Sequence, residues 1–143
     1  MSVARNRAAV LRFHEAISRH DLDAMGGCLA DGYRYHGPAD AGAVQDREAF
    51  LEFERAAFRA FPDLRVDVLD TVDERDLVAA RLRVSGTHRG EFLAIPASGR
   101  ALDLEYGNLS RFDSDGRIVE DRDHIDNLAL MQQCGVNSDA APG

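Results

Sequence analysis

The sequence predicts an α+β fold in which N-terminal helices pack on a curved, mostly antiparallel sheet. Before Pro62 the apolar residues recur with the period of a helix, and from Leu64 onward they alternate with the period of a strand. An Asp-Gly pair at 115–116 separates the last two strand-like runs, which indicates a hairpin. This order is typical of helices that cover one face of an antiparallel sheet.

Two helices are expected at the N-terminus. The first spans residues 3–19, where apolar positions follow helical spacing and arginines lie around them. Asp21 is the expected N-cap of a second, short helix that carries Leu22, Met25 and Leu29.

A short strand at residues 33–36 and a third helix complete the N-terminal half. The Gly- and Ala-rich loop at 37–43 is expected to border a cavity. Asp46 is a plausible N-cap for a helix at 47–60, and Pro62 stops that helix because proline lacks the backbone N–H.

The C-terminal half predicts four strands and a closing helix. Strands begin at Leu64, at Leu77 and at Leu102, and the fourth follows the turn at 113–116. Side chains alternate between faces along a strand. One face of the third strand therefore carries Leu102, Leu104, Tyr106, Asn108, Ser110 and Phe112.

The fourth strand carries the main chemical signal. One face holds Val119, Asp121, Asp123 and Ile125, and the other holds Ile118, Glu120, Arg122, His124 and Asp126. The first set has apolar residues at both ends and is expected to face inward. An unpaired carboxylate there has a raised pKa, in the range useful for acid/base catalysis. Whether Asp121 or Asp123 faces the cavity stays open at this point. Asp126 is expected to cap the last helix.

Composition excludes several classes of function. The chain has 143 residues and a net charge of -8, which argues against a general nucleic-acid or anionic-membrane surface. Cys28 and Cys134 have no metal-type spacing and are expected to be reduced thiols of a cytoplasmic protein. Neither a signal peptide nor a transmembrane run is visible. One domain at 1–136 with a frayed tail at 137–143 is expected.

Two blocks carry a family resemblance. Residues 85–100, SGTHRGEFLAIPASGR, are similar to the GTHxGxFxGIPx(T/S)G(K/R) stretch of SnoaL-like polyketide cyclases. Residues 112–133, FDSDGRIVEDRDHIDNLALMQQ, resemble the family's DG(K/R)IxExWDxxDxLGLxxQ ending. Ala94 stands where the family has Gly, and Arg122 stands where it has Trp. The resemblance implies the NTF2-like cone, and the two departures are expected to narrow a loop and to change the surroundings of Asp123.

The resemblance also implies an activity and a site. In characterised members a carboxylate takes a proton from an activated carbon, and intramolecular aldol closure follows with neither metal nor cofactor. Asp123 matches this acid/base, and Asn108 is expected to bind the developing enolate oxygen. Residues expected to contact a small lipophilic carbonyl compound are His88, Tyr106, Tyr35, His36, Tyr33 and Phe53.

Two other hypotheses remain beside the cyclase. One is a different NTF2-like reaction, catalysed by a hydrolase, dehydratase or isomerase, with a polar partner such as Asn108 or Tyr106 beside Asp123. The other is a non-catalytic binding or dimerisation module, in which Asp123 pairs with Arg111 or Arg122. A homodimer or a higher homo-oligomer is expected in either case. The sheet face with Leu109 among Asp103, Glu105 and Arg111 is the plausible interface.

Overall fold

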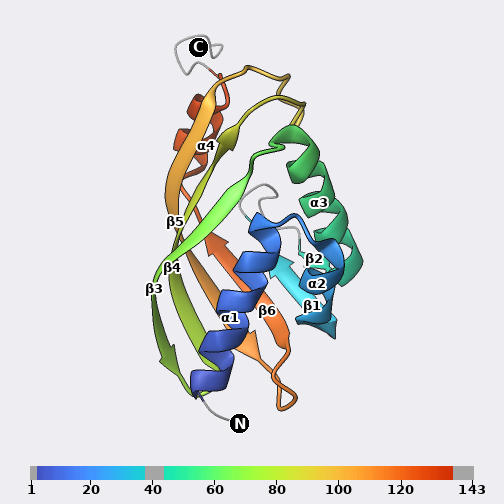
Figure 1. Ribbon diagram of the computed structural model, residues 1–143, viewed down its shortest axis with the longest axis vertical. Helices are drawn as coiled ribbons and strands as arrows, with labels where there is room; N and C mark the ends of the chain where they lie inside the picture. Colours follow the sequence, from blue (N-terminus) through green and yellow to red (C-terminus); the bar gives the residue numbers. More distant parts are fainter. Residues whose placement is uncertain (1–2, 38–43, 137–143) are drawn as a thin grey trace.

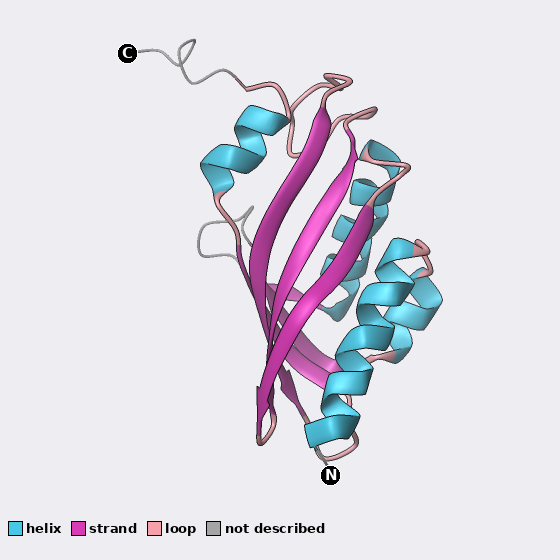
Figure 2. Ribbon diagram, turned by 60° about the vertical axis from the view of Figure 1, so that its left-hand side comes forward, coloured by secondary structure: helices cyan, strands magenta, loops and turns pink. Residues whose placement is uncertain are grey.

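Within the described residues, six strands form one curved sheet, and helices α1, α2 and α3 lie on one side of it (Figures 1 and 2). The computed structural model describes residues 3–37 and 44–136. Most of the loop expected to border a cavity (38–43) and the expected tail (137–143) lie outside the described residues. The predicted α+β class is confirmed.

The three N-terminal helices are α1 (Val3–Ser18), α2 (Leu22–Gly27) and α3 (Arg47–Ala60). The carboxylate of Asp21 accepts a hydrogen bond from the backbone N–H of Ala24, and that of Asp46 accepts one from Ala49. Both predicted N-caps are therefore confirmed. The prediction was wrong for Leu29, because α2 ends at Gly27 and Leu29 already begins the first strand.

The strands follow a mostly antiparallel order. They are β1 (Leu29–His36), β2 (Gln45–Asp46), β3 (Arg65–Glu74), β4 (Leu77–Thr87), β5 (Ala101–Phe112) and β6 (Ile118–His124). The order across the sheet is β2-β1-β6-β5-β4-β3, and only the β1–β6 pair is parallel. The last strand therefore lies in the middle of the sheet, beside the first long one.

A bulge changes the predicted alternation at the start of β6. Arg111 on β5 pairs with Glu120, whereas the next residue, Phe112, pairs with Ile118. The extra residue is Val119, and Ile118 consequently turns into the core, where it is fully buried. The predicted faces are wrong at these two residues and correct from Glu120 onward.

Helix α4 (Asn127–Gln133) covers the half of β5 that β6 leaves unpaired. Asp126 caps it as predicted, accepting a hydrogen bond from the backbone N–H of Ala129 at 3.0 Å. The Gln133 amide makes two hydrogen bonds with the backbone of Asp103, at 2.7 and 3.1 Å. The helix thereby takes the place of a neighbouring strand and closes one end of the interior.

The outer face of the sheet is charged. Arg81 binds both Asp70 and Glu105, and Arg83 binds Asp103 through two hydrogen bonds of 2.7 Å. The interior lies between the other face and the helices, and Phe13, Met25 and Tyr33 are among its buried side chains. Among the described helices, none is long and apolar enough to cross a membrane.

Candidate active site

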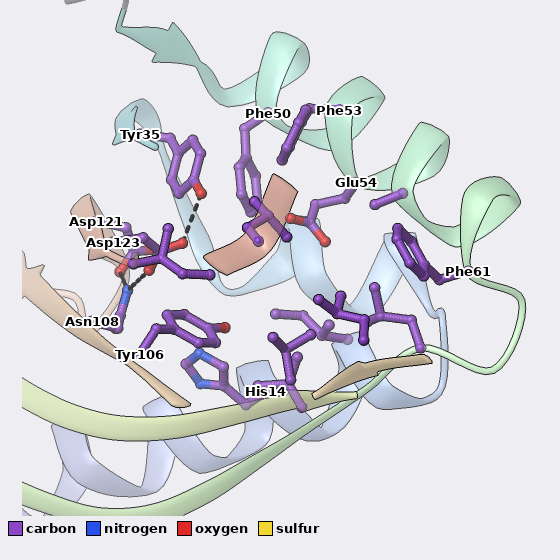
Figure 3. Close-up of a pocket in the computed structure, with 18 of the residues that line it drawn as sticks. His14, Tyr35, Phe50, Phe53, Glu54, Phe61, Tyr106, Asn108, Asp121 and Asp123 are labelled. Atoms are coloured by element: carbon purple, nitrogen blue, oxygen red, sulfur yellow. Dashed lines mark hydrogen bonds between the residues drawn. The ribbon is translucent and has the colours of Figure 1, made fainter. Parts of the chain in front are cut away.

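A cavity of about 110 Å³ lies between α1, α3 and the sheet (Figure 3). Its wall is mainly apolar, with aromatic rings among aliphatic side chains. The rings that line it are those of Phe13, Phe50, Phe53, Phe61, Phe92, Tyr35 and Tyr106. A wall of this kind suits a flat and largely apolar molecule.

A polar cluster forms one end of the cavity. Pairing of β5 with β6 sets Asn108 opposite Asp123 and Ser110 opposite Asp121, so the four side chains share one face. The Asn108 amide nitrogen donates to Asp123 at 2.8 Å and to Asp121 at 3.3 Å. The Ser110 hydroxyl lies within hydrogen-bond distance of Asp121 and of the Asn108 amide oxygen. Asp121 and Asp123 both line the cavity, so the cavity does not distinguish between the two candidate carboxyls.

Strand β1 supplies a tyrosine to each aspartate. Tyr33 donates its hydroxyl hydrogen to Asp121 at 2.8 Å, and Tyr35 donates to Asp123 at 2.7 Å. The parallel pairing of β1 with β6 makes this possible, because it sets Tyr35 opposite Asp121. The two carboxyls are therefore held from both neighbouring strands.

Burial shifts the proton equilibria of this cluster. Loss of water raises the pKa of Asp123 to about 7, and the charge of Asp121 adds to the effect, while the hydrogen bonds from Tyr35 and Asn108 oppose it. Burial also raises the pKa of Asp121, against its hydrogen bonds from Ser110 and Tyr33. Asp123 can therefore exchange a proton near neutral pH.

A third carboxyl faces the cluster from helix α3. The side chain of Glu54 points into the cavity (Figure 3), and burial together with the charges of Asp123 and Asp121 raises its pKa to about 8. His14 on α1 also lines the cavity. Burial lowers the pKa of His14, and its Nδ1 lies 2.9 Å from the Val10 carbonyl oxygen, to which only a protonated nitrogen can donate.

Comparison with known proteins identifies the family. The sequence profile of the SnoaL-like polyketide cyclases matches residues 8–134. The chain belongs to the SnoaL-like polyketide cyclase family. No curated protein sequence matches it.

Solved structures of SnoaL-like proteins are similar along nearly the whole chain. IdmH, a candidate polyketide cyclase from Streptomyces antibioticus, is 34% identical over 92% of this chain and 99% of its own, with a TM-score of 0.78. AclR, a candidate hydroxylase from Streptomyces galilaeus, is 27% identical over 94% of this chain and 98% of its own, with a TM-score of 0.82. A candidate SnoaL-like polyketide cyclase from Jannaschia sp. CCS1 is 27% identical over 98% of this chain and 94% of its own, also with a TM-score of 0.82. The NTF2-like fold predicted from the sequence is confirmed.

Most of the residues expected from the SnoaL-like resemblance meet at the cavity. Those that line it are Asp123, Asn108, Tyr106, Tyr35 and Phe53. Tyr33 stands behind this layer, fully buried against Asp121.

The two expected histidines do not line the cavity. His36 lies 3.2 Å from Glu120. His88 is fully buried, stacks on the ring of Phe61 at 5.2 Å and contacts the Ser98 hydroxyl through Nδ1. It thus supports a wall residue, Phe61, from behind and does not line the cavity.

Sequence reasoning missed Glu54 and His14. Glu54 follows Phe50 by one helical turn and precedes Ala57 by three residues, so it lies on the apolar stripe of α3. A carboxyl among apolar residues on one face of a helix was the sequence signal that could have indicated a site residue. His14 follows Val10 by one helical turn and precedes Ile17 by three residues, so it lies on the apolar face of α1 in the same way.

The two departures from the SnoaL-like pattern have local effects. Arg122 is exposed, pairs with Glu120 at 3.4 Å and does not line the cavity. Ala94 adopts a φ of 63°, in the left-handed region that favours glycine.

Proposed function

We propose that the protein is a cofactor-independent cyclase that closes a ring in an aromatic or polycyclic carbonyl compound by intramolecular aldol addition. One observation carries the proposal. The Asp123 carboxyl, held by Tyr35 and Asn108, opens onto an aromatic cavity and has a pKa of about 7. A base with a pKa near the working pH is the most effective proton carrier.

The reaction needs one proton carrier. Ionised Asp123 takes a proton from a carbon that lies between two carbonyl groups, and the C–H electron pair moves into one carbonyl to give an enolate. The enolate carbon then bonds to a second carbonyl carbon, whose π electrons move onto its oxygen. That oxygen takes the proton from Asp123, which is ionised again.

Asn108 serves this reaction as a positioning residue. Its amide nitrogen already donates to both aspartates, and its amide oxygen contacts Ser110. No amide hydrogen is left for an enolate oxygen, which was the role expected from the sequence. The hydrogen bond from Asn108 to Asp123 instead favours a role in which Asn108 fixes the orientation of the Asp123 carboxyl.

A hydrolase or dehydratase acting on a small lipophilic molecule is the second candidate. Activation of water needs a polar partner beside the base, and both Asn108 and Tyr35 reach Asp123. Labelled solvent oxygen appears in the product of a hydrolase and not in that of a cyclase. The ion pair expected for a non-catalytic module is not formed, because Arg111 pairs with Asp76 and Arg122 with Glu120.

Exchange of carbon-bound hydrogen tests the proposal without the natural substrate. An aromatic β-keto methyl ester is placed in deuterated buffer, and NMR follows loss of the methylene proton signal above the uncatalysed rate. We expect Asp123→Asn to lower the catalysed rate by about 10² to 10⁴.

Asp115→Asn is the matched control, because Asp115 is exposed in the turn between β5 and β6. It should exchange at the rate of the unaltered protein. An unchanged rate in Asp123→Asn, with ester still bound, rejects Asp123 as the base.

A further inference from the structure

Two side chains in the cavity have hydrogens to donate and no hydrogen-bond acceptor within the described part of the chain. They are Glu54 of α3 and Tyr106 of β5, and both line the cavity. Figure 3 shows the Tyr106 hydroxyl and the Glu54 carboxyl pointing into the same space, on the side away from the Asn108–Asp123–Tyr35 hydrogen bonds. Both side chains are partly exposed and both line the cavity, so one acceptor atom of a ligand placed there can take a hydrogen bond from each.

Glu54 keeps its proton at neutral pH because of what surrounds it. It is partly shielded from water, and Asp123 and Asp121 on β6 face it with negative charge. Tyr106 on β5 and Tyr35 on β1 are the other titratable groups near it, and burial raises the pKa of both well above the usual value. The described lining contains neither Lys nor Arg, and burial lowers the pKa of its histidine, His14. With no cation beside it, the Glu54 carboxyl stays a hydrogen-bond donor up to a pH of about 8.

We infer that Glu54 and Tyr106 together hold the carbonyl oxygen of the substrate and stabilise the negative charge that forms on it when Asp123 removes the adjacent proton. The inference rests on the proposed function and deepens it. Asp123 takes the proton, the C–H electron pair forms a carbon–carbon double bond, and the carbonyl π pair moves onto the oxygen. The two donors shorten their hydrogen bonds to that oxygen without losing their hydrogens. A neutral acid in an apolar site is a strong donor to such a charge.

This arrangement defines the class of substrate. The acidic hydrogen must be on the carbon next to the carbonyl carbon, because the base has to reach that hydrogen while the donors on the other side of the cavity hold the carbonyl oxygen. A ketone or β-dicarbonyl group on a flat aromatic body meets this requirement, and an alcohol or a phosphate ester does not.

Binding of 4-nitrophenol tests the inference independently of turnover. Its phenolate imitates an enolate, and its absorbance distinguishes the ionised from the neutral form. Asp123→Asn is used as the parent protein, so that charge on the base does not repel the probe. We expect phenolate affinity to fall as the pH rises through the pKa of Glu54, which lies below about 8 in this parent because the charge of Asp123, one cause of the raised pKa, is gone.

Two further variants locate the donors. Adding Glu54→Gln should remove this fall in affinity, because the amide donates at every pH. Adding Tyr106→Phe should weaken phenolate binding about tenfold or more below that pH, the usual effect of removing one donor from a charged acceptor, and should keep the fall. A fall that persists in Glu54→Gln, or full affinity in Tyr106→Phe, overturns the inference.

A direct titration covers the case in which Glu54→Gln does not fold. Carboxyl ¹³C NMR of the unaltered protein should show Glu54 titrating far above its ordinary pKa of 4.5, and titration near that value overturns the inference. The outcome is separate from the hydrogen-exchange experiment. If the donors behave as inferred and Asp123→Asn still exchanges, the proposed function fails and the anion site stands.

Discussion

Asp121 and Asp123 are two residues apart on one face of β6, and their different surroundings indicate different roles. Asp121 is 2% exposed and lies within hydrogen-bond distance of donors on Tyr33, Ser110 and Asn108. Asp123 meets two donors and is only partly buried. A fully surrounded carboxyl holds strands together, whereas a partly open one can reach a ligand.

Replacing Asp121 should therefore destabilise the fold. We predict that Asp121→Ala lowers the free energy of unfolding by about 3 kcal/mol, because it leaves the buried hydroxyl of Tyr33 without an acceptor and removes one acceptor each from Ser110 and Asn108. Urea unfolding followed by circular dichroism measures this. Asp123→Asn serves as the comparison and should lose less than about 1.5 kcal/mol. Equal losses in the two variants would contradict the division of roles.

At the scale of an element, the tight turn at 92–95 holds one wall of the cavity. Phe92 and Ile95 exchange two backbone hydrogen bonds, of 3.0 and 2.8 Å, around Leu93 and Ala94. Both central residues have positive φ, 52° and 63°. Phe92 packs on Phe53 and Phe61, with ring centroids 5.9 and 5.3 Å apart. The turn thus places an aromatic ring at the cavity through a backbone shape that side chains disfavour.

Glycine at position 94 should relieve this strain. A left-handed backbone conformation destabilises the folded state by roughly 1 to 2 kcal/mol when the residue is alanine. Glycine removes this strain, but it also makes the unfolded chain more flexible, which offsets part of the gain in stability. We predict that Ala94→Gly raises the free energy of unfolding by about 0.5 to 1 kcal/mol. The matched control is Ala97→Gly, an exposed loop position whose φ is not positive, which should lower it. A lowered value in Ala94→Gly would show that the turn is not strained.

Features that depend on neighbouring residues in the sequence were predicted better than features that depend on strand pairing. Asp21, Asp46 and Asp126 cap helices as expected, because a cap depends only on its neighbours in sequence. The strand β2 escaped prediction because it is only two residues long, and the bulge at Val119 escaped it because alternation along one strand does not reveal the register with its partner. Asp123 and Asn108 followed from alternation, whereas placing Glu54 requires knowing which face of α3 meets the sheet.

At the scale of the whole molecule, the fold holds two carboxyls with strongly raised pKa values. Folding raises the pKa of Asp123 from 3.8 to about 7 and that of Glu54 from 4.5 to about 8. Between about pH 4 and 8 the folded protein thus binds more protons than the unfolded chain. The contribution of these two groups to stability is greatest below about pH 4 and is lost as the pH rises to about 8.

The predicted homodimer and cytoplasmic location stay predictions.

A pH series of urea unfolding tests this linkage. We predict that the free energy of unfolding of Asp123→Asn/Glu54→Gln falls less between pH about 5 and 8 than that of the unaltered protein, because neither amide titrates. Asp115→Asn, with its exposed side chain, should keep the original slope. If the free energy of unfolding changes with pH in the same way in the double variant and in the unaltered protein, the pKa of neither carboxyl is shifted by folding.

The parallel pairing of β1 with β6 also determines when the site can form during synthesis. Tyr33 and Tyr35 precede their aspartate partners by 88 residues. At ribosomal rates of about 5 to 20 residues per second, β1 waits roughly 4 to 18 s for the strand that completes it. During that interval its apolar face and backbone edge are open to other chains. The nascent protein is then most vulnerable to aggregation, and the hydrogen bonds around Asp123 are among the last that the emerging chain can make.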